Sequence, residues 1–318
     1  MPERHPPPAI AEAVTVLKHG GLVAIPTETV YGLAADARNP DAVRKIFALK
    51  GRPADHPLIV HISGADRLAQ WAVDIPDIAY RLAARFWPGP LALVLKKRGD
   101  VPDEVTGGQP TVALRCPANA LTQELLRQFD GGLAAPSANR FGHISPTTAQ
   151  HVRDEFGERA PMILDGGPCT LGIESTIIDL TRSPARILRP GGIGIDQLRP
   201  FLPDIQAGGQ ADSPRVSGDM AAHYAPHTPL RMLSRGQLIE AARGQDAVVL
   251  CLDDLPHGLV GLAIPGDAAT YARELYASLR WLDRQQAAQI LLERIPQDGA
   301  WLAVADRIKR AIVGSSPN

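Results

Sequence analysis

Hydrophobic positions along the chain alternate between helical and strand-like spacing for most of its length. Ile10, Ala13 and Leu17 keep helical spacing, and a glycine pair follows where that helix is expected to end. Short apolar runs predict buried strands, and segments with one apolar face predict helices between them. We expect strands near residues 22–25, 58–62, 91–95, 111–116, 132–135, 175–180 and 185–188, and helices at 41–47, 78–86 and 121–129. Because several strands follow one another without a helix, the pattern predicts an α/β domain with a mixed sheet.

A polar segment without periodicity divides the chain. Residues 207–218 are rich in glycine, serine, aspartate and proline, which is typical of a linker. Regular spacing then resumes with two expected strands and two expected helices, at 247–252, 289–295, 268–284 and 301–313. The sequence therefore predicts a first domain over residues 9–204, a linker over 205–228 and a smaller α/β domain over 229–318.

Composition narrows the class of protein. The net charge of −1 provides no global basic field, which argues against a non-enzymatic RNA-binding module. Cys116, Cys169 and Cys251 are too widely spaced for a zinc knuckle or a disulfide framework, which fits a reducing compartment. The first residues lack a hydrophobic signal core, and no apolar run approaches the ~18 residues that span a bilayer. We therefore expect a cytoplasmic protein without a membrane partner.

Two short segments carry the first candidate chemistry. Lys50-Gly51-Arg52-Pro53 places two cations one residue apart, and Ser137-Ala138-Asn139 places a hydroxyl and an amide one residue apart. Cations and neutral hydrogen-bonding groups together suit a polyphosphate. A competing explanation is that the two cations complement the dipole at the end of the helix over 41–47. His56 and His61 favour a site, because they add two imidazoles close to the cations.

A strand arginine gives a second candidate. The alternation of residues 111–115 places Thr111 and Arg115 on the same side of one strand. An arginine among apolar neighbours needs an anion, which is either a carboxylate ligand or a structural salt-bridge partner. The hydroxyl-rich segment 26–33 follows the first expected strand, where α/β proteins tend to bind ligands.

Several common motifs are missing from the sequence. It contains no P-loop, no glycine-rich dinucleotide fingerprint, no G-x-S-x-G nucleophile and no cluster with metal-ligand spacing. Cations and hydroxyls without a nucleophile indicate catalysis by positioning and charge stabilisation. Phosphoryl and nucleotidyl transfer work in this way, with Mg²⁺ sharing the charge.

Six segments in this order resemble the YrdC/Sua5 family, the threonylcarbamoyl-AMP synthases. They cover residues 26–33, 50–53, 86–90, 135–139, 172–176 and 189–191. In addition, His223-Tyr224-Ala225-Pro226 is similar to the linker of the longer Sua5 branch, which carries a C-terminal domain that the short YrdC form lacks. Glu28 stands where aspartate is more usual, and Cys116 where a branched apolar residue is common.

The resemblance implies a fold and an activity. The fold would be a YrdC-like twisted mixed sheet with helices, plus a smaller Rossmann-like α/β domain. The activity would join L-threonine, bicarbonate and ATP, with Mg²⁺ and no organic cofactor, into threonylcarbamoyl-AMP and pyrophosphate. A threonylcarbamoyl transferase complex would then use the product to make N6-threonylcarbamoyladenosine in tRNA, so this chain would meet tRNA only indirectly. Hydrogenase maturation proteins, which carry a similar domain for carbamoyl transfer, are the alternative, but they are much longer and have zinc-finger motifs absent here.

The resemblance also implies roles for individual residues, and none of them binds a metal. The threonine site would comprise Thr29, His61, Arg115, the backbone at Ala135, and Ser175. The ATP site would comprise Arg52, His56, Thr111, Ser137, Ser145, Arg189, His223 and Tyr224. The catalytic set would be Lys50, Arg52, Ser137 and Asn139.

Overall fold

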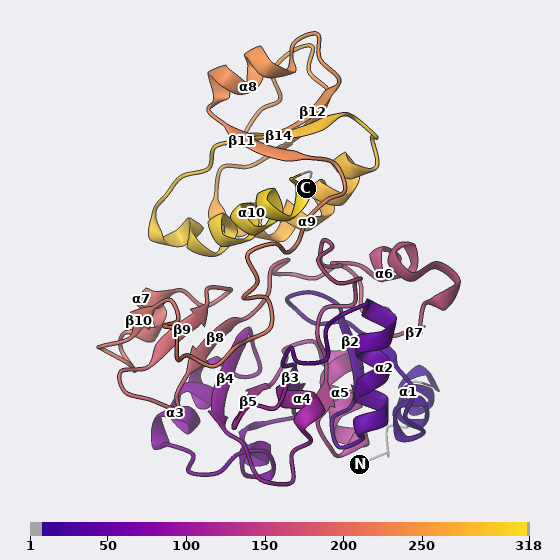
Figure 1. Ribbon diagram of the computed structural model, residues 1–318, viewed down its shortest axis with the longest axis vertical. Coiled ribbons are helices and arrows are strands. Elements are labelled where there is room, and N and C mark those ends of the chain that lie inside the picture. Colours follow the sequence, from indigo (N-terminus) through magenta and orange to yellow (C-terminus); the bar gives the residue numbers. More distant parts are fainter. Residues whose placement is uncertain (1–7, 317–318) are drawn as a thin grey trace, which may run out of the picture.

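The computed structural model describes residues 8–316 and contains two separate β-sheets (Figure 1). The strands of the larger sheet are β1 (Val23–Ile25), β2 (Gly32–Asp36), β3 (Ile59–His61), β4 (Leu91–Lys96), β5 (Thr111–Arg115), β6 (Leu133–Ala134), β7 (Met162–Ile163), β8 (Thr176–Asp179), β9 (Arg186–Arg189) and β10 (Gln206–Ala207). They lie in the order β10-β9-β8-β4-β5-β3-β6-β2-β1-β7, with parallel and antiparallel pairs. The mixed sheet predicted from the sequence is confirmed.

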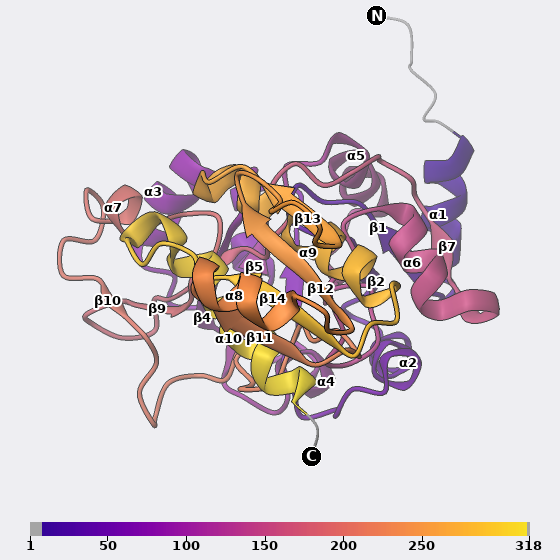
Figure 2. The same ribbon diagram turned by 90° about the horizontal axis from the view of Figure 1, so that it is seen from above.

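The smaller sheet is parallel throughout. Its strands are β11 (Leu230–Leu233), β12 (Ala247–Leu252), β13 (Gly261–Ile264) and β14 (Gln289–Glu293), in the order β11-β14-β12-β13. Helices α9 (Ala268–Asp283) and α10 (Leu302–Ser315) lie between this sheet and the larger domain, and α8 (Arg235–Ala242) covers the opposite face (Figure 1). Seen from above, this unit lies over the larger domain (Figure 2). The expected second α/β domain is therefore present.

The remaining helices surround the larger sheet. They are α1 (Pro8–Lys18), α2 (Pro40–Lys50), α3 (Asp77–Phe86), α4 (Asp103–Thr106), α5 (Ala120–Phe129), α6 (Ala149–Phe156) and α7 (Ile195–Leu198), with short 3₁₀ turns η1 (Ala65–Gln70), η2 (Gly157–Arg159) and, in the second domain, η3 (Gly299–Trp301). None of the helices between residues 8 and 316 is long and apolar enough to cross a membrane.

Some elements were not predicted. The sequence interpretation assigned the start of β2 to a ligand-binding loop, but β2 pairs with β1 and β6 inside the sheet. Its sequence, Gly-Leu-Ala-Ala-Asp, is buried without alternation, so it lacks the period of a half-exposed strand. Strand β10 pairs with β9 at the start of the segment assigned to the linker. The exact domain boundaries stay predictions.

The strand register gathers functional candidates at one edge of the larger sheet. Strands β3 and β5 are parallel, and their last residues, His61 and Arg115, are direct neighbours. Ser175 immediately precedes β8, and Arg189 is the last residue of β9, which runs antiparallel to β8. Gly191 permits this approach, since a Cβ there would lie 2.4 Å from the backbone of Ser175. One edge of the sheet therefore carries side chains from four strands.

Helix α2 fixes the cationic pair. The Asn39 side chain accepts hydrogen bonds from the backbone N–H groups of the first turn, and Pro40 has no N–H to satisfy there. Gly51 ends the helix in the left-handed conformation, with φ 64°. Lys50 and Arg52 therefore lie on either side of a sharp reversal of the chain.

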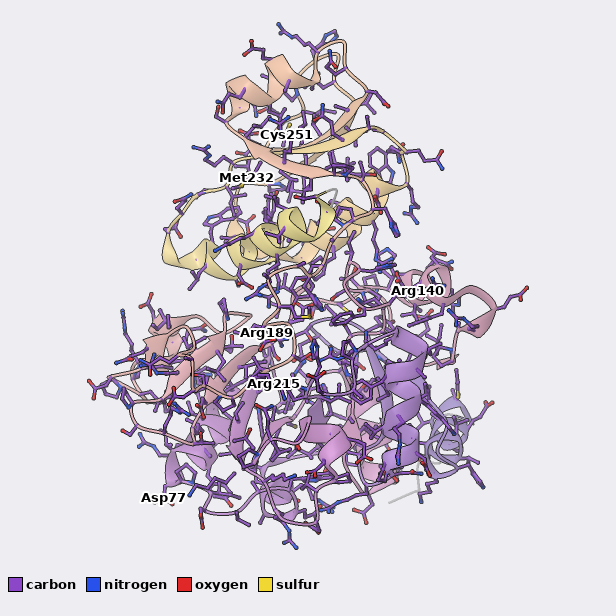
Figure 3. The ribbon with its side chains drawn as sticks, viewed as in Figure 1. Asp77, Arg140, Arg189, Arg215, Met232 and Cys251 are labelled. Carbon is purple, nitrogen blue, oxygen red and sulfur yellow. The ribbon has the colours of Figure 1, made fainter. Side chains whose placement is uncertain are left out.

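The hydrophobic core of the second domain continues into the first. Val30, Ile144 and Ile173 belong to the same buried cluster as the apolar residues of α9, α10 and β14. These three residues lie in loops of the larger domain, next to the segments that carry the candidate site. The second domain therefore packs directly against those loops, and side chains fill the space between the ribbons of the two domains (Figure 3).

Candidate functional site

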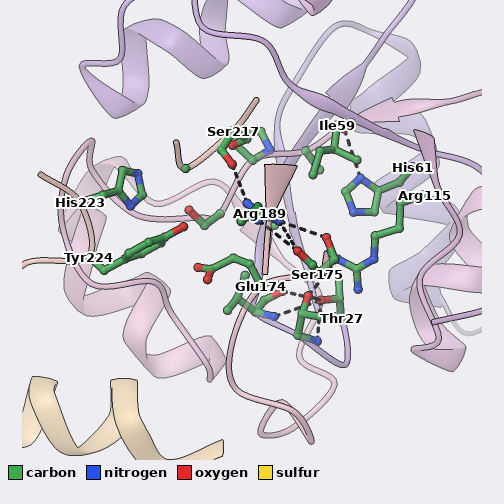
Figure 4. Close-up of a pocket in the computed structure, with 17 residues that line it drawn as sticks. Thr27, Ile59, His61, Arg115, Glu174, Ser175, Arg189, Ser217, His223 and Tyr224 are labelled. Atoms are coloured by element: carbon green, nitrogen blue, oxygen red, sulfur yellow. Dashed lines mark hydrogen bonds between the residues drawn. The ribbon is translucent and has the colours of Figure 1, made fainter. Parts of the chain in front are cut away.

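A pocket lies between the sheet edge and the linker (Figure 4). Predicted site residues that line it are Thr29, His61, Arg115, Ala135, Ser137, Ser175, Arg189, His223 and Tyr224. In Figure 4, His61 and Arg115 lie on one side, His223 and Tyr224 on the other, and Arg189 between them. The structure thus brings all five residues of the predicted threonine set and four of the eight residues of the predicted ATP set into one cavity.

Arg115 is anchored by neighbours and still lines the pocket. Its Nη2 donates to Glu28 Oε1 at 2.6 Å, its Nη1 to Thr29 Oγ1 at 2.9 Å, and its Nε to the backbone oxygen of Gly89 at 3.2 Å. Glu28 also accepts a hydrogen bond from the backbone N–H of Ala118. The salt bridge that the sequence left as an alternative is therefore present. These three contacts use three of the five guanidinium N–H groups, so two are left for a ligand.

His61 is a neutral group in the pocket wall. Its Nδ1 lies 3.3 Å from the backbone oxygen of Ile59, and the side chain is buried. Burial and the nearby charge of Arg115 lower the pKa of His61 to about 3. The imidazole is therefore uncharged at neutral pH and can donate or accept a hydrogen bond.

Arg189 joins the sheet to the linker. Its Nη2 donates to the Oγ of Ser175 at 3.1 Å, and its Nη1 donates to the backbone oxygen of Ser217 at 2.7 Å. The guanidinium is buried, and burial lowers its pKa from the ordinary value. A buried cation at the centre of the pocket favours an anionic ligand.

Lys50 does not line the pocket. Its ammonium donates to the backbone oxygens of Ser137, at 2.6 Å, and Asn139. Burial, together with the neighbouring Arg52, lowers the pKa of Lys50 well below its usual range. These contacts support a role in holding the 137–139 loop in shape. A direct contact of Lys50 or Asn139 with phosphate stays a prediction.

Arg52 and His56 lie behind the pocket lining. Arg52 donates to the backbone oxygen of Pro57 at 3.0 Å, and its guanidinium carbon lies 6.0 Å from the centre of the Phe141 ring. Burial lowers the pKa of Arg52 to about 10. The His56 ring packs edge-on against the same Phe141 ring at 5.4 Å, and partial burial lowers its pKa. Phe141 thus packs against both Arg52 and His56, which are predicted to bind the nucleotide.

Thr111 and Ser145, which are also predicted to bind ATP, do not line the pocket. Thr111 begins β5, four residues before Arg115, and is not part of the pocket wall. Ser145 is fully buried and donates its hydroxyl proton to Glu174 Oε1 at 2.6 Å. Ser145 therefore contacts the pocket through Glu174, and direct contact of either residue with ATP stays a prediction.

The pocket wall also contains residues to which no role was assigned from the sequence. They are Thr27, Val30, Gly32, Ile59, Pro136, Glu174, Ser217 and Gly218. Most belong to the segments that resemble the family, so the motifs could have suggested them. Ile59, Ser217 and Gly218 carry no such signal, because only the fold brings them to the cavity.

Glu174 is the carboxylate of the pocket wall. Burial would raise its pKa, but Arg307 and Arg189 outweigh that effect and hold the pKa at about 2. The group is therefore ionised at neutral pH. Among residues 8–316, no cluster of three or more histidine, cysteine, aspartate or glutamate side chains could hold a metal ion.

Several buried polar atoms without a partner gather around this region. Among the described residues, Arg52 Nε, Asn139 Oδ1, His223 Nδ1 and Tyr224 Oη are buried and make no hydrogen bond. Such atoms are uncommon in folded proteins and call for a physical explanation. All four belong to the predicted ATP or catalytic set. His223 and Tyr224 line the pocket, whereas Arg52 and Asn139 are not part of its lining.

The linker closes one side of the pocket in a strained conformation. Tyr224 has φ 61°, which is rare for a residue other than glycine and is typical of functional sites. Gly218 has φ 83°, and a Cβ there would lie 2.4 Å from Tyr224 Oη. Close packing between these two residues therefore depends on the glycine.

Family models match the chain on both sides of residue 192. The model for Sua5, YciO and YrdC proteins, described as telomere recombination, matches residues 15–191. The model described as the C-terminal domain of threonylcarbamoyl-AMP synthase matches residues 193–312.

Individual relatives match over nearly the full length. The threonylcarbamoyl-AMP synthase of Pyrococcus abyssi is 39% identical over 315 residues, covering 94% of this chain and 92% of that protein. The enzyme of the same name from Bacillus subtilis is 37% identical, and the match covers 96% of this chain and 94% of that protein. The crystal structure of P. abyssi Sua5 complexed with L-threonine has a TM-score of 0.90 at 38% identity, and the match covers 96% of this chain and 94% of that one.

Proposed function

This chain belongs to the Sua5 family of threonylcarbamoyl-AMP synthases, and we propose that its pocket condenses L-threonine, bicarbonate and ATP into threonylcarbamoyl-AMP and pyrophosphate. The strongest support for this proposal is that residues of the predicted threonine site and of the predicted ATP site line one cavity. Arg115 presents free guanidinium N–H groups at one side, and the unpartnered buried atoms His223 Nδ1 and Tyr224 Oη lie at the other.

Threonine binds on the Arg115 side in this proposal. The carboxylate of the amino acid accepts two hydrogen bonds from the guanidinium, while Glu28 and Thr29 hold that guanidinium in place. The neutral His61 and the hydroxyl of Ser175 line the same pocket and would contact the rest of the substrate. The threonine-bound state of the P. abyssi relative supports this half of the proposal.

ATP binds on the linker side. Arg189 and Arg52 supply positive charge for the phosphates, and Ser137 supplies a hydroxyl. The unpartnered Nε of Arg52, Nδ1 of His223 and Oη of Tyr224 gain partners when the nucleotide is present. Mg²⁺ enters as the MgATP complex, because the triphosphate carries more negative charge than two guanidinium groups offset.

The chemistry then needs no nucleophile from the protein. The threonine amine adds to bicarbonate, and loss of water leaves a carbamate. An oxygen of that carbamate attacks the α-phosphorus of ATP, and pyrophosphate leaves with its negative charge stabilised by the buried cations. The protein contributes by holding the two substrates in one cavity and by stabilising charge on the phosphates.

The linker acts as a lid over the nucleotide. His223 and Tyr224 line the pocket, and the φ of 61° at Tyr224 supports this role, because such uncommon backbone conformations cluster in ligand clamps and switch segments. The product passes to a threonylcarbamoyl transferase complex that modifies tRNA, so this chain meets tRNA only indirectly. The compartment would be the cytoplasm, where ATP and tRNA are available.

Pyrophosphate release tests the proposal. The purified protein with threonine, bicarbonate, Mg²⁺ and ATP should release pyrophosphate, and omission of either threonine or bicarbonate should abolish the signal. Steady release without threonine would contradict the proposal. For the lid, cleavage of the chain near Ser217 should lower turnover, and unchanged turnover would refute that part.

A further inference from the structure

The carboxylate of Glu174 is held by three donors from two domains. Its Oε1 accepts from Ser145 Oγ at 2.6 Å, and its Oε2 accepts from Tyr276 Oη at 3.0 Å and from Arg307 Nε at 2.6 Å. Tyr276 lies on α9 and Arg307 on α10, so two of the three donors come from the second domain. Both oxygens of a pocket carboxylate are thus engaged by groups outside the pocket.

Arg307 is buried to an unusual degree for a charged residue. The exposed fraction of its side chain is 0%, against 8% for Glu174. Arg307 also donates to the backbone oxygen of Pro190 at 3.0 Å, next to Arg189 in the chain. A cation in such a place needs an anion, and two carboxylates provide it: Glu174, and the less buried Asp306, whose Oδ2 accepts from Arg307 Nη1 at 2.7 Å.

The same two residues of the second domain contact the linker. The guanidinium carbon of Arg307 lies 5.2 Å from the centre of the Tyr224 ring. The Tyr276 ring stacks against the Tyr224 ring at 5.7 Å. Figure 4 shows that Glu174 lies between Tyr224 and Ser175, on the side of the pocket where we place the nucleotide. The second domain therefore supports both the carboxylate and the ring that covers it.

An ionised carboxylate at this position opposes the binding of phosphate. Like charges a few ångströms apart repel each other, and burial strengthens the repulsion. Without another cation, Glu174 would also compete with ATP for Arg189, which lines the same wall. Arg307 compensates the charge of Glu174, because it pairs with that carboxylate from outside the pocket. Arg189 then stays in the pocket wall, where it can contact the phosphates.

We propose that Arg307 and Tyr276 are positioning residues through which the second domain neutralises and orients Glu174, so that the pocket accepts a triphosphate. The inference rests on the proposed function, because it assumes that ATP binds beside Glu174. It assigns to the second domain a part in nucleotide affinity. A purely structural bridge between domains would change stability but would leave the relative affinities for ATP and threonine as they are.

A matched pair of tyrosine variants on one helix tests the proposal. Y276F removes one hydrogen bond to Glu174 and buries no new charge. Y271F is the control, since the Tyr271 hydroxyl is also buried on α9 but has no partner among the described residues. The measurement is equilibrium binding of a non-hydrolysable ATP analogue and, separately, of L-threonine to the full-length chain. We expect Y276F to weaken binding of the analogue about threefold to tenfold, with threonine binding unchanged and Y271F like the parent.

A charge variant and its compensating partner extend the test. R307M should weaken binding of the analogue about tenfold, because the carboxylate loses its cation. The double variant R307M/E174Q has neither charge and should recover affinity to within about threefold of the parent, whereas R307K should keep it. If R307M does not fold, the comparison of Y276F with Y271F decides.

Three outcomes separate the possible errors. If the parent chain binds neither the ATP analogue nor threonine, the proposed function fails together with the inference. If the parent binds both and Y276F binds the analogue as tightly as Y271F does, the inference alone is refuted. Equal weakening of ATP and threonine binding in Y276F would also refute it, because that result would indicate a general loss of structure.

Discussion

Replacement of Arg115 by lysine should weaken threonine binding while ATP binding is kept. The guanidinium makes three hydrogen bonds to Glu28, Thr29 and Gly89, and it has two N–H groups left for the substrate carboxylate. Lysine keeps the positive charge that Glu28 needs, but its compact ammonium cannot bind a carboxylate through a planar fork.

The size of the effect follows from the lost contacts. A hydrogen bond to a charged group contributes about 1.5–3 kcal/mol, and loss of one such bond corresponds to about tenfold to 150-fold weaker threonine binding. The ion pair with Glu28 is buried, with exposed fractions of 5% for Arg115 and 12% for Glu28. A variant without the positive charge would therefore lose more folding stability than a lysine variant, which keeps the charge and lacks only the planar guanidinium. The lysine variant therefore separates substrate recognition from folding.

Titration calorimetry with L-threonine and with a non-hydrolysable ATP analogue is the assay. Arg98→Lys is the control, because Arg98 is about half exposed and pairs with Asp100 at the surface. Threonine binding by R115K as tight as in the parent would refute the assignment of Arg115 to the carboxylate. A selective loss of ATP binding would instead place Arg115 on the nucleotide.

Three further predictions follow from the geometry of the site. Gly218→Ala should raise the KM for ATP about tenfold, because its Cβ would lie 2.4 Å from Tyr224 Oη and push the linker away. Lys50→Met should lower the free energy of unfolding by about 3 kcal/mol and weaken ATP binding, since two carbonyl oxygens lose a charged donor. The pKa values of His61 and His223 are lowered by burial from 6.5 to about 3, so the unfolded chain binds more protons below pH 6.5. Between pH 7 and pH 5, each histidine should therefore reduce the free energy of unfolding by about 2 kcal/mol, as measured by urea denaturation.

Each of these predictions has a matched control or a contradicting result. Gly208→Ala lies in the same linker with φ 86° and meets no atom within 4 Å, so it should leave the KM for ATP unchanged. Lys45→Met on the same helix removes a bond to Gly20 far from the pocket and should leave ATP binding unchanged. Equal effects of the variant and its control would contradict either prediction. A free energy of unfolding that is the same at pH 7 and pH 5 would contradict the pH prediction.

The sequence predicted elements well where larger apolar residues form a run, a regular alternation or one helical face. The runs at 91–95 and 111–116 appear as β4 and β5, and the apolar stripe at 121–129 appears as α5. It failed where a strand is short and made of small residues, as in β2, or where it follows a linker without a clear period, as in β11. In those segments the pairing partners decide the structure, and the partners are distant in sequence.

The site shows the same division. Local patterns pointed to three site residues. Arg115 is a cation on an alternating, otherwise apolar strand, Ser175 is a hydroxyl at a strand start after glycine, and Arg189 is a cation before a tight turn. The contacts of Arg307 and Tyr276 with Glu174 could not be foreseen, since they join residues more than one hundred positions apart. Such contacts depend on how the two domains pack, and no local pattern encodes that packing.

Direct detection of the product tests the central claim. The protein should be incubated with MgATP, ¹³C-bicarbonate and ¹⁵N-threonine, and the mixture analysed by liquid chromatography and mass spectrometry. We expect an adenylate that carries both isotopic labels, formed in step with pyrophosphate. Formation of AMP or ADP without a doubly labelled adenylate would contradict the account.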